Sequence, residues 1–304
     1  MTDPASIVFV HGMYLNSDSW QPWLTLARSR GHLCHAPSWP YHEGDPATLR
    51  GTVDPGLGSP TFGDVTRFLE RYLKTLPEPP VLIGHSIGGL LVQKLVNLGY
   101  GRAGVTLSSA PAQGIVSLDP HFWAANFPHV NPLAGNRPVR MTPKRFHYTF
   151  CNTMPRSASD EAFERYVVPE SRNVPRSTLT RQGRIDFRAD HPPMLFVAGD
   201  RDHLTPAGMV GRNARGYARS GSAVEFKLFT RPLALHLQPG RLGVRRRLRP
   251  GLGRRAHRSG LAARMSRQRG LPSRCRPRAV RTSARTVKPA AARSRPTAGS
   301  GLVR

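Results

Sequence analysis

A serine flanked by glycines, in Gly84-x-Ser86-x-Gly88, is the side chain of this sequence best suited to nucleophilic chemistry. The apolar run 81–83 precedes it, and a second apolar run begins at Leu90. The chain must therefore turn sharply between a short strand and a helix, and glycines allow that turn because they have no Cβ. Such a turn is a nucleophile elbow, which holds the serine in a strained conformation and lifts its hydroxyl above the sheet edge.

Two backbone N–H groups are expected to serve this serine. The helix that follows Ser86 points its N-terminal N–H groups at the same place, where negative charge is favoured. Serine attack on a carbonyl would form an oxyanion, and we expect the N–H of Ile87 to stabilise it. The run His11-Gly12-Met13 closes the first strand, and the N–H of Met13 is the expected second donor.

Three segments together carry a family resemblance: "FVHGMYLNSDSW", "LIGHSIGGLLVQ" and "LFVAGDRDHLTP". In this order they resemble the α/β-hydrolases over about residues 6–230. The segment "RFHYTFCNTMPRSASDEAFERYVVPESR" resembles the cap of a group of small bacterial serine hydrolases, an esterase and lysophospholipase-like group. The resemblance implies a Ser–His–Asp triad, with no metal and no organic cofactor.

The triad acid implied by the resemblance lies in a Gly-x-x-Asp loop after a strand. Here that loop begins at Gly199 and contains two aspartates. Asp202 is the predicted acid and Asp200 the alternative. A carboxylate in this position would orient the imidazole and stabilise its cationic form. The alternative interpretation is that both aspartates only cap the following helix.

The triad histidine is the residue that the sequence does not supply clearly. The family pattern resembles Gly-Arg-Ser-His beyond the last strand, and the expected position falls near Ala234. His236 comes two residues later and is a weak candidate for the base. His203 is too close in sequence to Asp202, His85 is turned away by the elbow, and His257 lies in a basic tail where no geometry can be argued.

That tail, residues 231–304, has an unusual composition. It holds 21 of the 45 Lys and Arg residues and none of the 18 Asp and Glu, so it accounts for most of the net charge of +27. One hypothesis is a frameshifted translation, since synonymous codons around 231–236 can read Gly-Arg-Ser-His after loss of one base. The other is a genuine disordered tail that contacts nucleic acid or anionic lipid nonspecifically through its charge.

Strands and helices alternate along the first 230 residues, which predicts an α/β fold with a mostly parallel sheet. We expect helices to flank that sheet, and a last helix after 224–229 to cover one of its faces. The expected strands are 7–10, 32–36, 81–83, 104–107, 194–198 and 224–229, and the expected helices are 20–30, 62–76, 90–98 and 206–217. Residues 37–60 are predicted to form a loop.

Four segments follow from this pattern: core residues 1–110, a cap insertion 111–191, core residues 192–230 and the basic tail 231–304. Helices are expected in the cap near 142–152 and 159–166. The cap aromatic residues expected to line an apolar pocket are Trp123, Phe127, Phe146, Tyr148, Phe163 and Tyr166.

The expected activity is hydrolysis of a small, apolar carboxylic ester or related acyl bond. The alternative is a catalytically inactive protein of the same shape that binds polyanions through its tail. Three scattered cysteines, without a signal peptide or an apolar run of about 18 residues, predict a cytoplasmic protein.

Overall fold

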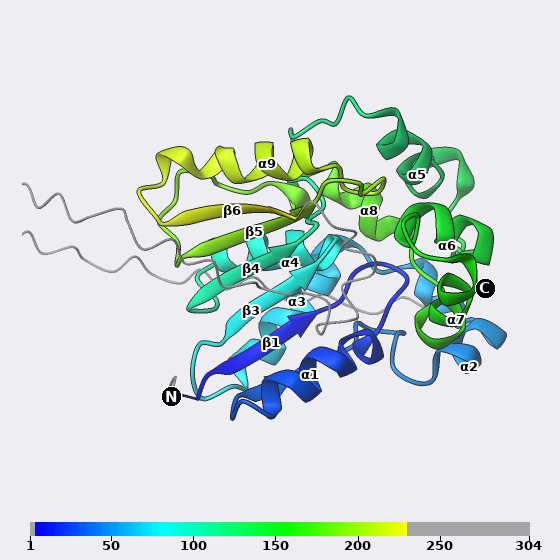
Figure 1. Ribbon diagram of the computed structural model, residues 1–304, viewed down its shortest axis with the longest axis horizontal. Helices are drawn as coiled ribbons and strands as arrows, with labels where there is room; N and C mark the ends of the chain where they lie inside the picture. Colours follow the sequence, from blue (N-terminus) through cyan, green and yellow to red (C-terminus); the bar gives the residue numbers. More distant parts are fainter. Residues whose placement is uncertain (1–3, 230–304) are drawn as a thin grey trace, which may run out of the picture. The chain divides into compact units, whose positions relative to one another are not determined.

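Six parallel strands form the central sheet in the computed structural model, which describes residues 4–229 (Figure 1). Each strand pairs in parallel with its neighbours, in the order β2-β1-β3-β4-β5-β6. The predicted α/β fold is therefore confirmed, and the described sheet is parallel throughout. The strands are β1 Ser6–Val10, β2 Leu33–His35, β3 Val81–His85, β4 Ala103–Leu107, β5 Met194–Gly199 and β6 Val224–Phe229.

Helices cover the two faces of the sheet unequally. Helix α1 (Gln21–Arg28) packs on one face, whereas α3 (Phe62–Lys74), α4 (Ile87–Asn97) and α9 (Ala207–Gly216) pack on the other. Helix α3 begins with a capping box, in which Thr61 and Asp64 each bond the backbone of the other. The described residues all belong to one compact unit.

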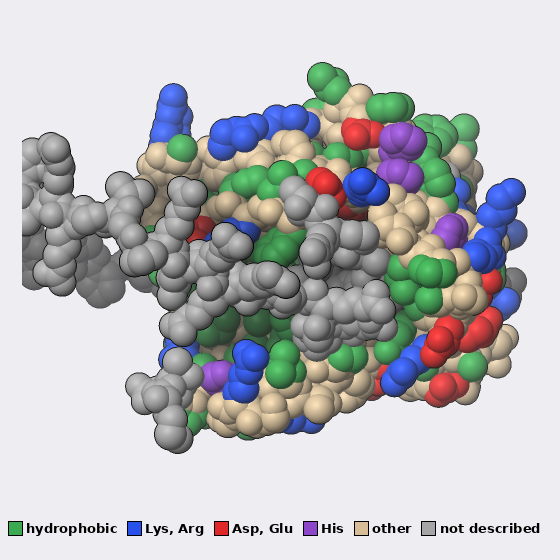
Figure 2. Space-filling view, in the orientation of Figure 1, with side chains coloured by type: hydrophobic (Ala, Val, Ile, Leu, Met, Phe, Trp, Pro, Cys, Tyr) green, Lys and Arg blue, Asp and Glu red, His purple; other side chains and the backbone are tan. Residues whose placement is uncertain are grey.

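The difference between the two faces is visible in the strands. Leu82 and Phe196, which face α3, α4 and α9, are fully buried. Ile83, Val105 and Leu195 point to the opposite face and are only partly buried. Figure 2 shows hydrophobic side chains over the strands between α1 and α9. The helix that the sequence predicts for this face follows β6 and lies outside the described residues.

The insertion between β4 and β5 gathers at the carboxyl ends of the strands, on the right of Figure 1. It contains α5 Pro120–Val130, α6 Pro143–Phe150, α7 Arg156–Tyr166 and α8 Asn173–Thr178, with two short 3₁₀ turns at Pro132–Ala134 and Arg181–Gly183. Helices α6 and α7 match the predicted ones. The sequence analysis missed α5 and α8, although Asp119 caps α5 and Pro120 opens it, which is a common helix start.

The prediction of a loop over 37–60 was wrong in part. Helix α2 (Pro46–Gly51) and a 3₁₀ turn (Pro55–Gly58) lie within it. In each case an aspartate precedes a proline, and its carboxylate accepts a backbone N–H: Asp45 from Thr48 at 2.8 Å, and Asp54 from Gly56 at 2.7 Å. These local caps stabilise short helices whose apolar periodicity is too brief to detect.

Candidate active site

Ser86 sits at the sharp turn between β3 and α4. Its backbone adopts φ 55° and ψ −120°, a conformation that a side chain rarely tolerates. The turn is possible because neighbouring backbone segments come into close contact at glycines, which have no side chain. A Cβ on Gly84 would lie 2.2 Å from the carbonyl oxygen of Gly88, and a Cβ on Gly88 would lie 2.3 Å from that of Val10. The strain at Ser86 is thus imposed by close backbone packing on both sides.

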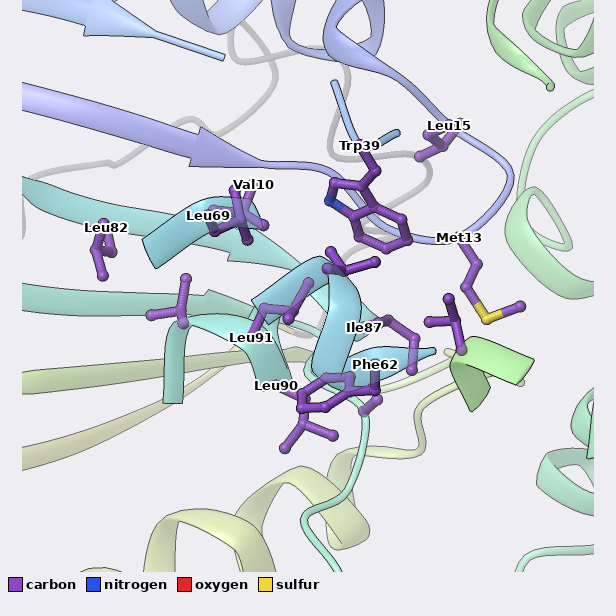
Figure 3. Packing of buried hydrophobic residues seen from close by; sticks show 14 of the residues in the cluster. Val10, Met13, Leu15, Trp39, Phe62, Leu69, Leu82, Ile87, Leu90 and Leu91 are labelled. Atoms are coloured by element: carbon purple, nitrogen blue, oxygen red, sulfur yellow. The ribbon is translucent and has the colours of Figure 1, made fainter. Parts of the chain in front are cut away.

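The loop after β1 lies directly against this turn. A Cβ on Gly12 would come within 3.1 Å of the Cβ of Ser86. The next residue, Met13, and the first residue of α4, Ile87, both line the cavity that contains Ser86. Figure 3 shows these two side chains coming from the loop and from the helix start. Neither backbone N–H donates a hydrogen bond to another residue within 4–229, so both are candidates to bind an oxyanion.

Buried His11 orients the peptide that carries the N–H of Met13. Its Nε2 accepts the N–H of Trp39 at 3.1 Å, so the ring proton is on Nδ1, which donates to the carbonyl of Gly12 at 2.9 Å. Burial first, and then the charge of His42, lower the pKa of His11 well below its ordinary value. The neutral ring therefore fixes the Gly12 carbonyl, and in a trans peptide the N–H of Met13 points in the direction opposite to that carbonyl.

Asp202 follows β5 and is bonded by its own loop. Its Oδ1 accepts the N–H groups of Leu204 and Thr205, each at 2.9 Å, and its Oδ2 accepts the hydroxyl of Thr205 at 2.9 Å. Ser108, at the end of β4 with φ 45°, also bonds this carboxylate. Asp200 differs because its side chain is exposed and its backbone N–H pairs with Phe229 at 3.1 Å.

The environment of Asp202 opposes its negative charge. Burial raises the pKa of this carboxyl above its ordinary value, although the hydrogen bonds from Thr205, Ser108 and Leu204 lower it. A charge held there in spite of its burial would favour a neighbouring cation, such as an imidazolium.

Ser86 and Asp202 follow strands on either side of β4 at the same edge of the sheet. The carboxyl ends of β3 and β5 are two strand spacings apart, which is about 10 Å. An imidazole ring with one hydrogen bond at each end spans most of such a gap. The spacing therefore leaves room for a histidine between the two candidate residues.

An apolar cavity of about 200 Å³ opens at Ser86. Its apolar wall is formed by the loops after β1, β4 and β5, the start of α4 and the insertion between β4 and β5: Met13, Ile87, Ile115, Val116, Phe122, Trp123, Val130, Phe150 and Leu204.

Of the six cap aromatics predicted to line this cavity, only Trp123 does. Phe146, Phe163 and Tyr166 are buried in the cap core instead, whereas Phe127 and Tyr148 are exposed. Phe122 and Phe150, which were not predicted to do so, also line the cavity.

One polar pair in the cavity wall was not predicted. The hydroxyl of Tyr14 lies 2.6 Å from Nδ1 of His129 in α5, and both residues are buried. Burial lowers the pKa of His129 to about 3, and the charges of Arg145 and Arg172 contribute to this. The ring is therefore neutral at pH 7 and forms a hydrogen bond with the tyrosine hydroxyl. A histidine with this pKa is a poor general base.

The other histidine candidates occupy different places. His203 stacks on His121, with ring centroids 4.4 Å apart, and its Nδ1 lies 3.3 Å from the carbonyl of Tyr148. The ring of His85 lies beside Gly12, where a Cβ would be 3.1 Å from its Nδ1. His236, His257, the proposed frameshift and the basic tail with its predicted polyanion contacts all lie outside the described residues.

Within residues 4–229, no cluster of three or more His, Cys, Asp or Glu side chains is arranged to hold a metal ion. In the same range, no helix is both long enough and apolar enough to cross a membrane.

Comparison with protein families places these features in a known class. Residues 7–229 match the model of the alpha/beta hydrolase family, a range that begins within β1 and ends with β6. The chain belongs to this family, and the resemblance inferred from its motifs is confirmed. Family membership supports a hydrolase. None of the curated proteins compared with the chain matches it.

Solved structures share the fold at low sequence identity. A monoacylglycerol lipase from Paleococcus ferrophilus is 19% identical, with a TM-score of 0.53, over 75% of this chain and 86% of that one. An extracellular alpha/beta-hydrolase from a Paenibacillus species is 19% identical, with a TM-score of 0.57, over 77% and 95%. Tomato methylketone synthase I in complex with 2-tridecanone is 15% identical, with a TM-score of 0.55, over 75% and 90%.

The elbow makes a steric prediction. Gly88→Ala should destabilise the protein by about 3 kcal/mol or more, because the new Cβ meets backbone that cannot rotate away. Gly51→Ala is the matched control, since a Cβ there meets nothing within 4 Å. Urea unfolding of both variants measures the difference. Equal stability of the two variants would contradict the described turn.

Asp202→Asn should be more stable than the parent protein at pH 7. The folded-state pKa of Asp202 is raised, so its charge costs stability above that pKa, at about 1.4 kcal/mol for each pKa unit. As the pH falls through the folded-state pKa toward the unfolded value, the parent gains a proton and the advantage of the variant disappears. Urea unfolding at several pH values tests this, with exposed Asp200→Asn as the control; a constant difference would contradict it.

Proposed function

We propose that the protein is a serine hydrolase that cleaves an apolar carboxylic ester or a related acyl bond. The observation that carries the proposal is the position of Ser86, at the tip of a strained turn, beside the N–H groups of Met13 and Ile87 and open to an apolar cavity. This arrangement suits attack on an uncharged carbonyl whose acyl or alcohol group is apolar.

In the proposed reaction, the hydroxyl oxygen of Ser86 attacks the ester carbonyl, and its proton passes to a histidine. The N–H groups of Met13 and Ile87 stabilise the oxyanion of the tetrahedral intermediate. The histidine then protonates the leaving alcohol, which leaves an acyl-serine. Water, deprotonated by the same histidine, hydrolyses that ester and frees Ser86.

Asp202 is the proposed partner of this histidine. Its position after β5, with only β4 between it and the strand of Ser86, supports this role over that of exposed Asp200, as do its hydrogen bonds to Ser108 and Thr205. The histidine itself is expected after β6, as the sequence pattern predicts, with His236 as the candidate in this chain. Methionine and isoleucine contribute only backbone N–H groups, so their side chains are free to shape the cavity.

The names of two fold neighbours agree with an apolar substrate. One is a monoacylglycerol lipase, and another was solved with 2-tridecanone, an apolar ketone. An apolar ester of the esterase or lysophospholipase type is accordingly the proposed substrate class for this chain.

A fluorophosphonate probe tests the proposal on the full chain. The probe should label Ser86, and Ser86→Ala should abolish labelling, since only an activated serine attacks phosphorus. Asp202→Asn should slow labelling by about 10³–10⁴-fold, because the base loses its orienting carboxylate. Asp200→Asn is the control and should label at the parental rate. Circular dichroism confirms folding, and a folded chain that is not labelled would overturn catalysis by this chain.

A further inference from the structure

Tyr14, next to the proposed oxyanion donor Met13, has an unusual backbone. Its φ is 62°, in the left-handed region that non-glycine residues seldom enter. Such a conformation persists only where its surroundings hold it in place. The groups that hold the N–H of Tyr14 therefore also fix the peptide that follows Met13.

Both backbone polar groups of Tyr14 are held by the segment that follows α7. The carbonyl of Tyr14 accepts the N–H of Val168 at 2.9 Å, and its N–H donates to Oε2 of Glu170 at 3.1 Å. Glu170 is fully buried, and its Oε1 accepts the N–H of Ser171 at 2.7 Å. Its own backbone pairs with Val139 in both directions, at 2.8 and 2.9 Å, so the carboxylate stands on a rigid base.

The charge of Glu170 is matched by a buried histidine. Nε2 of His42 lies 3.3 Å from Oε2 of Glu170, and its Nδ1 lies 3.0 Å from the carbonyl of Pro40. Both ring nitrogens face acceptors, an arrangement that favours the doubly protonated imidazolium. Burial alone would lower the pKa of His42, but the Glu170 carboxylate and the Pro40 carbonyl raise it above its ordinary value.

Two uncharged rings pack against His42. The rings of His11 and Trp39 lie with centroids 5.6 Å from that of His42. His11 is neutral, as its hydrogen bond from Trp39 requires. Glu170 and His42 thus form a two-residue ion pair enclosed between the loop after β1, the loop before α2 and the cap.

We propose that Glu170 is a positioning residue for the oxyanion hole. Its carboxylate, which is held by His42, accepts the N–H of Tyr14, and we call this contact the clamp. His11 fixes the peptide before Met13 through the Gly12 carbonyl, and Glu170 fixes the peptide after it through Tyr14. The donor at Met13 is consequently held from both sides. The role given to Met13 rests on the proposed function, whereas the clamp on Tyr14 does not.

A purely structural role would not need a charged pair. Replacing a buried ion pair by apolar residues of similar size is often neutral or stabilising, because desolvation offsets the attraction. A carboxylate does what a leucine of similar size cannot, since it accepts a backbone N–H in a fixed direction. Two variants separate the charge of residue 170 from its ability to accept a hydrogen bond. Glu170→Leu removes both, whereas Glu170→Gln removes the charge and retains an acceptor oxygen.

Hydrogen exchange of the Tyr14 amide in the full chain tests the clamp without any need for activity. Glu170→Leu should raise its exchange rate by about 10-fold or more relative to amides of α4, and Glu170→Gln should raise it less. Leu73→Ala, a buried truncation in α3, is the control that lowers stability without touching the clamp. If Glu170→Leu does not fold, the exchange rate of the Tyr14 amide relative to the α4 amides is compared between the parent and Glu170→Gln.

Two results would overturn the clamp: an unchanged Tyr14 rate, or a rise in proportion with the α4 amides as in Leu73→Ala. A second readout tests its role in the oxyanion hole. In a chain that labels Ser86, Glu170→Leu should lower the maximal labelling rate by about 10-fold or more, with the half-saturating probe concentration unchanged. An unchanged maximal labelling rate in Glu170→Leu would contradict the positioning role of Glu170. Absence of labelling in the parent would contradict the proposed function, and the exchange rate of the Tyr14 amide would still test the clamp.

Discussion

The close backbone crossing at Gly84, Gly88 and Val10 is the constraint on which the rest of the site depends. A Cβ at either glycine would overlap a carbonyl oxygen, so the turn closes only with glycine there. The closed turn places Ser86 in a strained conformation and starts α4 directly beneath it. Everything else at the edge of the sheet is arranged around that fixed hydroxyl: the loop after β1 packs on the serine, and the loop after β4 bonds its carbonyl through Ala110 at 2.9 Å.

The parallel sheet gives this local turn its chemical surroundings. The carboxyl ends of parallel strands lie at one edge, so residues distant in sequence meet there. Ser86, Ser108 and Asp202 follow three neighbouring strands, and Ser108 joins the middle strand to the candidate acid. The cap lies over the same edge and encloses the apolar cavity. The polar side chains proposed to act in catalysis thus lie beside an apolar cavity.

The cap also takes part in the geometry of the loop after β1. It contacts that loop in two ways. The backbone of Tyr14 is bonded by Val168 and by the carboxylate of Glu170, and the hydroxyl of Tyr14 is hydrogen-bonded with His129. A residue between two such contacts has little freedom to move. The core therefore fixes the conformation of Ser86, and the insertion helps to fix the conformation of the loop after β1.

Short-range signals in the sequence determined the strands, the flanking helices and the elbow. Glycine spacing and apolar runs act over a few residues, so they can be read without the fold. The aspartate after β5 was reached through the family motif. Glu170, His42 and His129 carried no such signal, because a lone polar residue in a cap or loop has the same local pattern whether it is exposed or buried. Only the tertiary structure decided their roles, since the contact of Glu170 with Tyr14 joins residues 156 positions apart, and a carboxylate becomes a clamp only when burial leaves it no water to bind.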